Sequence, residues 1–438
     1  MPDTSVFQRQ QLYLRPDPAR VIVRPFRPTT EPRDLQPTDR RRANHIVERV
    51  LALSESAAAA ELCDVLDNFE TRHRDLVQTL DQRAAEMDQA FADHPAFSRL
   101  QRQLVGAYFL QEYSYEASAL FNPSIVPHPD PSGTTDGAIR VILSLRAVGE
   151  GHVSSMTFRS GQIGRDGRMS LDPGARLAGL PEVFHNLESG ADTDDVTLRF
   201  NPLWDLSERV IFPVTLRQSN GVEDARFVAF DHGDRVVYYA TYTAYDGRSI
   251  RSELLETTDF VTFRMRPMTG AACLNKGMAL FPRRLNGQFA MIGRQDNENL
   301  HLIYSDDLTR WEQGTPFLSP EYPWEFVQIG NCGSPIELDE GWLLFTHGVG
   351  ALRKYAIGAV LLDRNDPSRV IARSAMPLIR PDPAEREGYV PNVVYTCGAL
   401  RHGDRIILPF AVSDTFTNFA SASIRELLDS LTPVTGRA

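Results

Sequence analysis

Two carboxylates and a guanidinium lie within four positions of one short segment, NGVEDARF at residues 220–227. Apolar residues flank Glu223, Asp224 and Arg226 in a pattern that is typical of a buried strand. Burying a charge costs free energy unless the charge is paired. Two interpretations therefore stay open: Arg226 forms a structural ion pair with Glu223 or Asp224, or the cluster faces a polar cleft that uses it.

Asp224 and Asp414 are the two candidates for acid–base chemistry. Asp414 ends a second apolar run, ILPFAVSD. A carboxyl group in a partly dry funnel can keep its proton near neutral pH and act as general acid on a glycosidic oxygen. Tyr242 is one of several aromatic residues near these runs that could stack on the face of a sugar ring.

Basic residues that end or follow other apolar runs are candidates for an anion site. Charge-assisted hydrogen bonds favour a small oxyanion beside several donors, and the candidates are Lys276, Arg294 and His347. Plainer roles also stay open. A lone lysine is often solvated, and His347 closes the run WLLFTH, which is typical of a core strand.

Other familiar catalytic patterns are absent from the sequence. It contains no glycine-rich phosphate loop, no HExxH and no GxSxG segment. The four cysteines are widely spaced and form no CxxC pair. We therefore expect no metal site and no organic cofactor, and a packing role for Cys332.

A recurring unit after about residue 116 indicates the element that positions these groups. Each copy has a turn, a β-rich apolar run and a polar ending, and the turns contain Gly137, Gly233, Gly287, Gly341 and Gly403. Repetition of a β unit at this spacing predicts a mainly β fold, a five-bladed β-propeller. A pair of β-sandwiches is the alternative. In a propeller the polar endings, which include Arg146, Asp246, Arg294, His347 and Asp414, would converge on one funnel.

The first 115 residues have a different pattern. Residues 1–40 show little period and are interpreted as an irregular arm, whereas apolar residues recur at helical spacing from 41 to 115 and predict two or three amphipathic helices. We expect an N-terminal α-helical extension at 1–115 and a catalytic propeller at 116–438. We expect the helices to cover the main domain or to form the contact of a homo-oligomer, and the two roles are compatible.

Composition excludes several classes of function. The net charge of −11 argues against nucleic-acid or anionic-membrane partners. The opening residues MPDTSVFQRQQ lack the apolar core of a signal peptide, and no run approaches the roughly 18 apolar residues of a membrane span. Together with the isolated cysteines, this predicts a cytoplasmic protein.

Several separated motifs resemble the β-mannoside phosphorylases of glycoside hydrolase family 130. They occur in order between about residues 116 and 430: GVEDAR, NKGMALFPRRLNGQFAMIGR, GNCGSPIELDEGWLLFTHGVG and EGYVPNVVYTCGAL followed by SDT. The resemblance implies a five-bladed β-propeller, in agreement with the repeats. The helical extension and the segment EYSYEASALFNPSIVPHPD resemble the branch that acts on β-1,2-linked oligomannosides.

The resemblance also implies a reaction, the inverting phosphorolysis of β-1,2-mannooligosaccharides. Asp224 would protonate the leaving oxygen through the mannose 3-hydroxyl, while inorganic phosphate, the co-substrate, attacks the opposite face and α-mannose 1-phosphate leaves. Phosphate binding is implied for Lys276, Arg294 and His347. Substrate binding is expected of a larger set: Asn122, Arg146, Glu223, Arg226, Tyr242, Asp246, Gln328 and Asp414.

Two positions depart from the family pattern. Ala225 replaces the proline of the commoner Glu-Asp-Pro-Arg motif, and Gln328 stands where many relatives carry a basic residue, which bears on the strength of phosphate binding. Two other functions therefore remain as alternatives. An inverting hydrolase on the same scaffold needs a second carboxylate to activate water, and a carbohydrate-binding propeller needs no catalytic group.

Overall fold

The computed structural model describes residues 6–26, 38–88, 97–186 and 195–434, and it is mainly β. The chain divides into two compact units. One consists of Met1–Asp17, Glu116–Gly174 and Leu180–Ala438, and the other of Pro18–Tyr115 with Ala175–Gly179. No helix among the described residues combines the length and the apolar character needed to cross a membrane.

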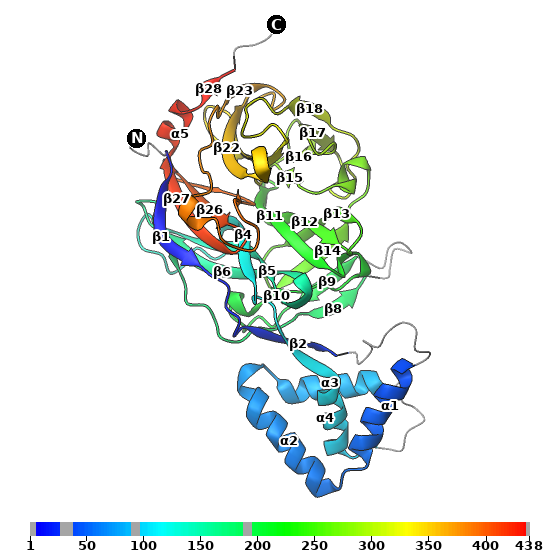
Figure 1. Cartoon of the computed structure of the whole chain (residues 1–438). Helices are drawn as coiled ribbons and strands as arrows, with labels where there is room; N and C mark the ends of the chain where they lie inside the picture. The colour runs from blue at the N-terminus through cyan, green and yellow to red at the C-terminus, as the bar shows by residue number, and fades with distance from the viewer. Residues whose placement is uncertain (1–5, 27–37, 89–96, 187–194, 435–438) are drawn as a thin grey trace. The chain divides into compact units, whose positions relative to one another are not determined.

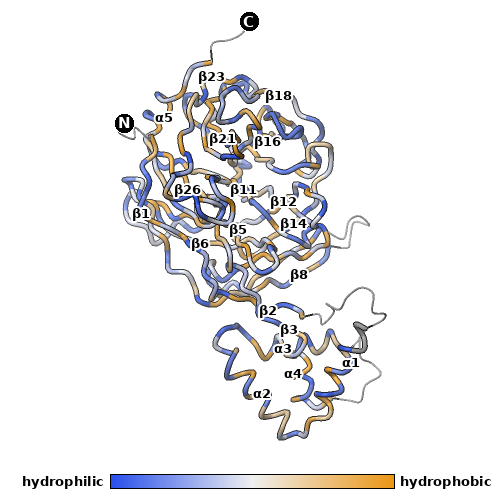
Figure 2. The backbone as a smooth tube through the Cα atoms, viewed as in Figure 1, coloured by the Kyte–Doolittle hydropathy of each residue, from blue (hydrophilic) through white to orange (hydrophobic). Residues whose placement is uncertain are grey.

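The smaller unit is helical, where the sequence pattern predicts helices. Its described residues form four α-helices, more than the two or three predicted: α1 (Thr38–Leu51), α2 (Glu55–Phe69), α3 (Leu76–Asp88) and α4 (Arg99–Tyr108). They also form two antiparallel strands, β2 (Val21–Pro25) and β3 (Leu110–Ser114). Ser54 caps α2 and Ser98 forms a capping box with Gln101 at the start of α4. Hydrophobic and hydrophilic stretches alternate along the helices (Figure 2), whose apolar faces meet in one core.

The described residues of the larger unit form four sheets, and Figure 1 shows them following one another around it. The longest contains β4 (Ala119–Pro127), β5 (Ile139–Val148), β6 (Ser154–Ile163), β11 (Gly221–Asp231), β12 (Val236–Tyr245), β13 (Ile250–Thr257), β14 (Thr262–Pro267), β9 (Val196–Arg199) and β8 (Glu182–His185), in that order. Two short strands, β7 (Met169–Leu171) and β10 (Val210–Ile211), also pair with β6. The halves of this sheet join only at one parallel pair, Gly221 with Ser154.

The other three sheets are smaller. The second contains β15 (Ala279–Leu280), β16 (Phe289–Gly293), β17 (Leu300–Ser305) and β18 (Thr315–Leu318). The third contains β19 (Gln328–Asn331), β20 (Ile336–Glu337), β21 (Trp342–Val349), β22 (Tyr355–Leu362), β23 (Val370–Arg373) and β28 (Thr432–Pro433). The fourth contains β24 (Val394–Tyr395), β25 (Leu400–His402), β26 (Arg405–Val412), β27 (Phe416–Ser423) and β1 (Gln8–Leu14), and helix α5 (Ile424–Asp429) follows β27.

The five glycines of the sequence repeat lie where the pattern predicts turns. Each precedes a buried strand, namely β5, β12, β16, β21 or β26. Four of them, Gly137, Gly233, Gly287 and Gly403, have φ between 60° and 92°. Glycine reaches this left-handed region without the steric penalty that a Cβ would bring, so the turns depend on it.

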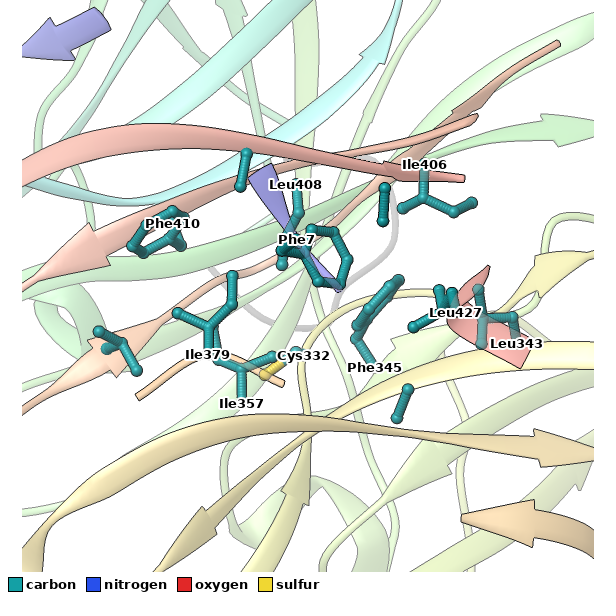
Figure 3. Packing of buried hydrophobic residues seen from close by; sticks show 14 of the residues in the cluster. Phe7, Cys332, Leu343, Phe345, Ile357, Ile379, Ile406, Leu408, Phe410 and Leu427 are labelled. Carbon is teal, nitrogen blue, oxygen red and sulfur yellow. The ribbon is translucent and has the colours of Figure 1, made fainter. Parts of the chain in front are cut away.

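The expectation of an irregular arm over residues 1–40 is wrong for its described parts. Strand β1 pairs antiparallel with β27, and β2 pairs with β3. β1 reads QRQQLYL and is largely polar, and its partner lies at the far end of the chain, so no local period marks it. Just before it, Phe7 enters the core beside Phe345, with ring centroids 6.0 Å apart (Figure 3).

Candidate active site

Three of the predicted site residues have strained, left-handed backbone that sets the direction of their side chains. The register of β4 shifts between Phe121 and Ser124, and that of β11 shifts between Glu223 and Arg226. Inside these irregularities Asn122 has φ 47° and Asp224 has φ 51°, while Asp414 has φ 48° in the turn after β26. Left-handed φ is rare outside glycine and is best tolerated by Asn and Asp. Such strain and such bulges cluster at functional sites, because they redirect a side chain.

These side chains meet in a cavity of about 340 Å³ within the larger unit. Eight of the twelve predicted site residues line it: Asn122, Arg146, Glu223, Asp224, Lys276, Arg294, His347 and Asp414. Its lining includes exposed residues such as Arg353 and buried residues such as Asp224 and His347. The convergence of strand ends that the repeats predict is therefore present.

Arg146 organises the acidic side of the cavity. Its Nη2 donates to Glu223 Oε1 at 2.7 Å and its Nη1 to Asp224 Oδ1 at 3.3 Å, while its Nε donates to Ser154 Oγ at 2.9 Å. Asn122 Nδ2 donates to the same Asp224 oxygen at 2.7 Å. The carboxylate of Asp224 is thus held in one orientation by donors from two other strands.

Arg226 does not form the carboxylate ion pair that was one interpretation of the sequence. Its Nη1 donates to the backbone carbonyl of Asp224 at 2.8 Å and its Nη2 to Tyr395 Oη at 2.6 Å. The side chain is buried and does not line the cavity. We conclude that Arg226 holds the strained backbone of Asp224 in place from outside the cavity lining.

The two candidate acids differ in protonation. Burial alone would raise the pKa of Asp224, but Arg146, Lys276 and Arg226 lower it to about 2. Burial raises the pKa of Asp414 to about 7, and the nearby Asp224 charge acts in the same direction. In the free chain Asp224 is therefore ionised, contrary to the expectation of a retained proton, whereas Asp414 is half protonated near neutral pH.

Lys276, Arg294 and His347 form the basic side. Arg294 is buried and donates from Nε to the backbone oxygen of Lys276 at 3.3 Å. Within the described ranges, no carboxylate forms an ion pair with Lys276 or Arg294. A buried cation without a counter-charge is unfavourable, so this side of the cavity is prepared for an anion.

The four remaining predicted residues lie outside the cavity lining, Arg226 among them. Tyr242 points into the protein, where its hydroxyl donates to Glu253 Oε2 at 2.5 Å. Asp246 lies one residue beyond β12 and accepts from the backbone of Arg248 and Ser249, both at 2.7 Å. Gln328 begins β19 and is half-buried. The pleat of β12 explains the correction for Tyr242, because alternate side chains face opposite ways.

Two loops of the same shape carry residues that the sequence analysis does not name as candidates. Residues 149–153 follow β5 and residues 350–354 follow β21, and each loop contains two consecutive left-handed residues. The second of these is His152 in one loop and Arg353 in the other. Arg353 lines the cavity, and His152 Nδ1 is 2.8 Å from the hydroxyl of Tyr389, which also lines it. His152 and Arg353 occupy equivalent positions in the repeat, and this equivalence is the sequence signal that could have identified them.

The Cys332 side chain packs in a hydrophobic core and does not line the cavity. Burial raises the pKa of the Cys332 thiol to about 12, which fits a packing role. In the part of the chain that the structure describes, no group of three or more His, Cys, Asp or Glu residues is arranged to hold a metal ion.

Comparison with known proteins gives consistent matches. The sequence profile of glycoside hydrolase family 130, described as beta-1,4-mannooligosaccharide phosphorylase, matches residues 203–432. The 1,2-beta-oligomannan phosphorylase of Thermoanaerobacter sp. (strain X514) is 33% identical over 51% of this chain and 75% of its own length. The beta-1,2-mannobiose phosphorylase of Listeria innocua serovar 6a is 30% identical over 50% of this chain and 63% of its own length.

A solved structure supports the same relationship at the level of the fold. The beta-1,2-mannobiose phosphorylase from Listeria innocua, in complex with beta-1,2-mannobiose, has a TM-score of 0.52 and 21% identity over 72% of this chain and 92% of that chain. The profile covers more than half of the sequence, and the Thermoanaerobacter relative is matched over three quarters of its length. The predicted membership is confirmed: this chain belongs to glycoside hydrolase family 130.

Proposed function

We propose that this chain cleaves β-1,2-linked mannooligosaccharides with inorganic phosphate, inverts the anomeric configuration and releases α-mannose 1-phosphate and a shortened oligosaccharide. One observation carries the proposal. A clamped carboxylate, Asp224, and a basic cluster without carboxylate partners line the same cavity. Phosphorolysis needs both, a proton donor for the leaving oxygen and a site for the attacking anion.

The basic cluster takes the place of a general base. Phosphate is already anionic at neutral pH, so it needs positioning and charge complementarity more than deprotonation. Lys276 and Arg294 supply that charge from the cavity wall, and phosphate held there attacks the anomeric carbon on the face opposite the leaving oxygen. One such displacement inverts the configuration.

Phosphate binding also changes the protonation of Asp224. In the free chain Lys276 is one of the cations that lower the pKa of this carboxyl. A bound phosphate dianion opposes that cation, so the pKa of Asp224 rises and a proton can be taken up. Asp224 then protonates the leaving oxygen through the mannose 3-hydroxyl, as the family resemblance implies.

The β-1,2 linkage is supported by the relatives. The Thermoanaerobacter and Listeria proteins, at 33% and 30% identity, are both named for β-1,2-linked mannosides. The family profile carries a β-1,4 description. We give the individual relatives more weight, because a profile description covers all branches of a family.

We further propose that the larger unit is a five-bladed propeller and that α1–α4 form an N-terminal extension to it. The longest sheet joins its halves by a single parallel pair, and separating it there leaves five groups of strands in the larger unit. Pairing of β1 with β27 supports a ring, because it joins the first strand of the unit to one near its end. Five blades would also account for the five glycine turns.

A hydrolase is the second candidate, and two further carboxylates in the cavity favour it. Glu223 and Asp414 line the cavity with Asp224, and an inverting hydrolase needs a second carboxylate as its base. Glu223 is already paired with Arg146, however, and Asp414 is half protonated near neutral pH. The ion pair weakens Glu223 as a base, whereas a pKa near 7 suits Asp414 to that role. We place phosphorolysis first because a hydrolase has no use for a basic cluster without carboxylate partners.

The test is to incubate the protein with β-1,2-mannotriose, with and without inorganic phosphate. Mannose 1-phosphate and free mannose are then measured separately. Mannose 1-phosphate formed only with phosphate is the expected result. Free mannose in both reactions would refute phosphorolysis and favour the hydrolase, and no product in either would favour a carbohydrate-binding propeller.

A further inference from the structure

We infer that His347 accepts a hydrogen bond from the bound anion, so that the basic cluster selects an oxyanion that carries a hydrogen, such as phosphate or arsenate, over sulfate. This inference rests on the proposed function and adds to it the form in which the anion is recognised. It depends on the tautomer of one imidazole and on the groups around it.

The hydrogen bond at Nδ1 fixes that tautomer. His347 Nδ1 is 3.2 Å from the backbone oxygen of Asn331. A carbonyl oxygen only accepts, so Nδ1 carries the hydrogen, and a neutral imidazole then has a bare lone pair on Nε2. The Cys332 thiol lies 3.7 Å from the same nitrogen. If this thiol donated its hydrogen to Nδ1, the bare lone pair of Nδ1 would face the carbonyl oxygen of Asn331, which is unfavourable.

Asn331 cannot easily turn away from the imidazole. It belongs to β19 and pairs with Thr346 of β21, so its backbone is fixed by the sheet. Its side-chain amide donates to the backbone oxygens of Gly277 and Ile292. The acceptor that orients His347 is therefore part of the rigid framework.

The surroundings keep the imidazole neutral. Burial, with Arg294 and Arg226 nearby, lowers the pKa of His347 well below its usual range, against weaker opposition from Asp224. Its ring stacks on Tyr355 with centroids 5.8 Å apart and tilts against Tyr395 at 4.8 Å. Neither aromatic face offers the counter-charge that an imidazolium would need.

The bare nitrogen belongs to a side chain that lines the cavity. His347 is a cavity residue, and none of the described residues forms a hydrogen bond with its Nε2. Room for this edge of the ring depends on Gly330, where a Cβ would stand 2.6 Å from Nε2. A ligand in the cavity is then the partner available to this lone pair.

Lys276 and Arg294 attract any small dianion, but His347 distinguishes among them. Near neutral pH phosphate and arsenate each carry a hydrogen that can be donated to Nε2, whereas sulfate carries none. Sulfate would place an oxygen lone pair against the nitrogen lone pair and leave both unsatisfied. A hydrogen bond to a charged group changes affinity by about tenfold or more, which sets the expected selectivity.

The test is calorimetric titration of the whole chain with phosphate, arsenate and sulfate at pH 7.5 and matched ionic strength. The wild type should bind phosphate and arsenate at least about tenfold more tightly than sulfate. His347→Phe, which keeps a ring in the same space, should bind phosphate about tenfold more weakly and bring the phosphate-to-sulfate ratio close to one. Lys276→Met is the matched control, because it should weaken both anions and preserve their ratio.

Equal binding of sulfate and phosphate by the wild type would overturn the inference, whatever the fate of the variants. So would a His347→Phe protein that still prefers phosphate, or sulfate binding accompanied by the uptake of one proton, since His347 would then donate as an imidazolium. The proposed function fails separately, if mannose is released without phosphate. Phosphate-dependent product from a protein that binds both anions equally would refute only the selection by His347.

Discussion

Replacing Asp414 by Asn should stabilise the protein, and increasingly so as the pH rises from 5 to 8. The folded chain raises the pKa of Asp414 from its ordinary 3.8 to about 7. Between these two values the folded state binds a proton that the unfolded state has lost, so the wild type loses stability as the pH rises through this window. Asn has a similar shape and no charge to bury, so the variant escapes this loss.

The size of the effect follows from the shift. Without screening by solvent, a shift of about three pKa units would change the free energy of unfolding by about 4 kcal/mol, at about 1.4 kcal/mol per unit. Asp414 borders an open cavity and is only partly covered, so water screens its charge and the realised difference should be about 1–2 kcal/mol. Asp224, whose pKa lies at about 2, stays ionised between pH 5 and 8 and adds no pH dependence of stability in that range.

Thermal unfolding of both proteins at pH 5, 6, 7 and 8 measures the difference. For a chain of this length we expect the Tm advantage of Asp414→Asn to grow by about 2 °C across the series. Asp246→Asn is the control, because hydrogen bonds from the turn lower the pKa of Asp246 to about 2, so its effect on Tm should not vary in this range. An Asp414→Asn advantage that is constant or shrinks with pH would refute the argument.

Three further variants test the division of labour in the cavity. Asp224→Asn should reduce mannose 1-phosphate release by about 10²–10⁴ with unchanged circular dichroism, because the reaction loses its general acid; near-normal turnover would remove that role. Lys276→Met should raise the KM for phosphate about tenfold or more and change the KM for the sugar by less than about twofold; an unaltered phosphate dependence would mean that the anion binds elsewhere. Arg226→Lys should lower kcat about tenfold with little change in either KM, since one ammonium cannot hold both the Asp224 carbonyl and Tyr395 Oη; a normal kcat would make Arg226 merely structural.

The sequence reveals those parts of the fold that local physics determines. Turn glycines are visible because the left-handed region is closed to most other residues, and the helices of the smaller unit show their period because one face of each is buried. Strand β1 has neither mark. Its seven residues are mostly polar, and it pairs with β27 at the other end of the chain, so no local pattern distinguishes it from an irregular segment.

The same distinction separates what could be predicted of the site from what could not. Strand ends in a repeat converge, and this argument places Arg146, Arg294, His347 and Asp414 correctly in one cavity. Which face a given residue takes depends on register. The register shift in β11 turns Asp224 toward the cavity, while unbroken pairing of β12 with β13 sends Tyr242 into the protein. Register arises from tertiary pairing, which no short segment encodes.

The charge balance of the cavity links the two halves of the proposed reaction. On the acidic side Arg146 forms ion pairs with both Glu223 and Asp224. On the basic side the described structure gives Lys276 and Arg294 no carboxylate, so their counter-charge must come from the ligand. Because Lys276 also lowers the pKa of Asp224, the anion that completes the basic side is the anion that allows Asp224 to be protonated. The nucleophile would thus activate the acid, and in a sugar complex without phosphate Asp224 would stay ionised and unable to protonate the leaving oxygen.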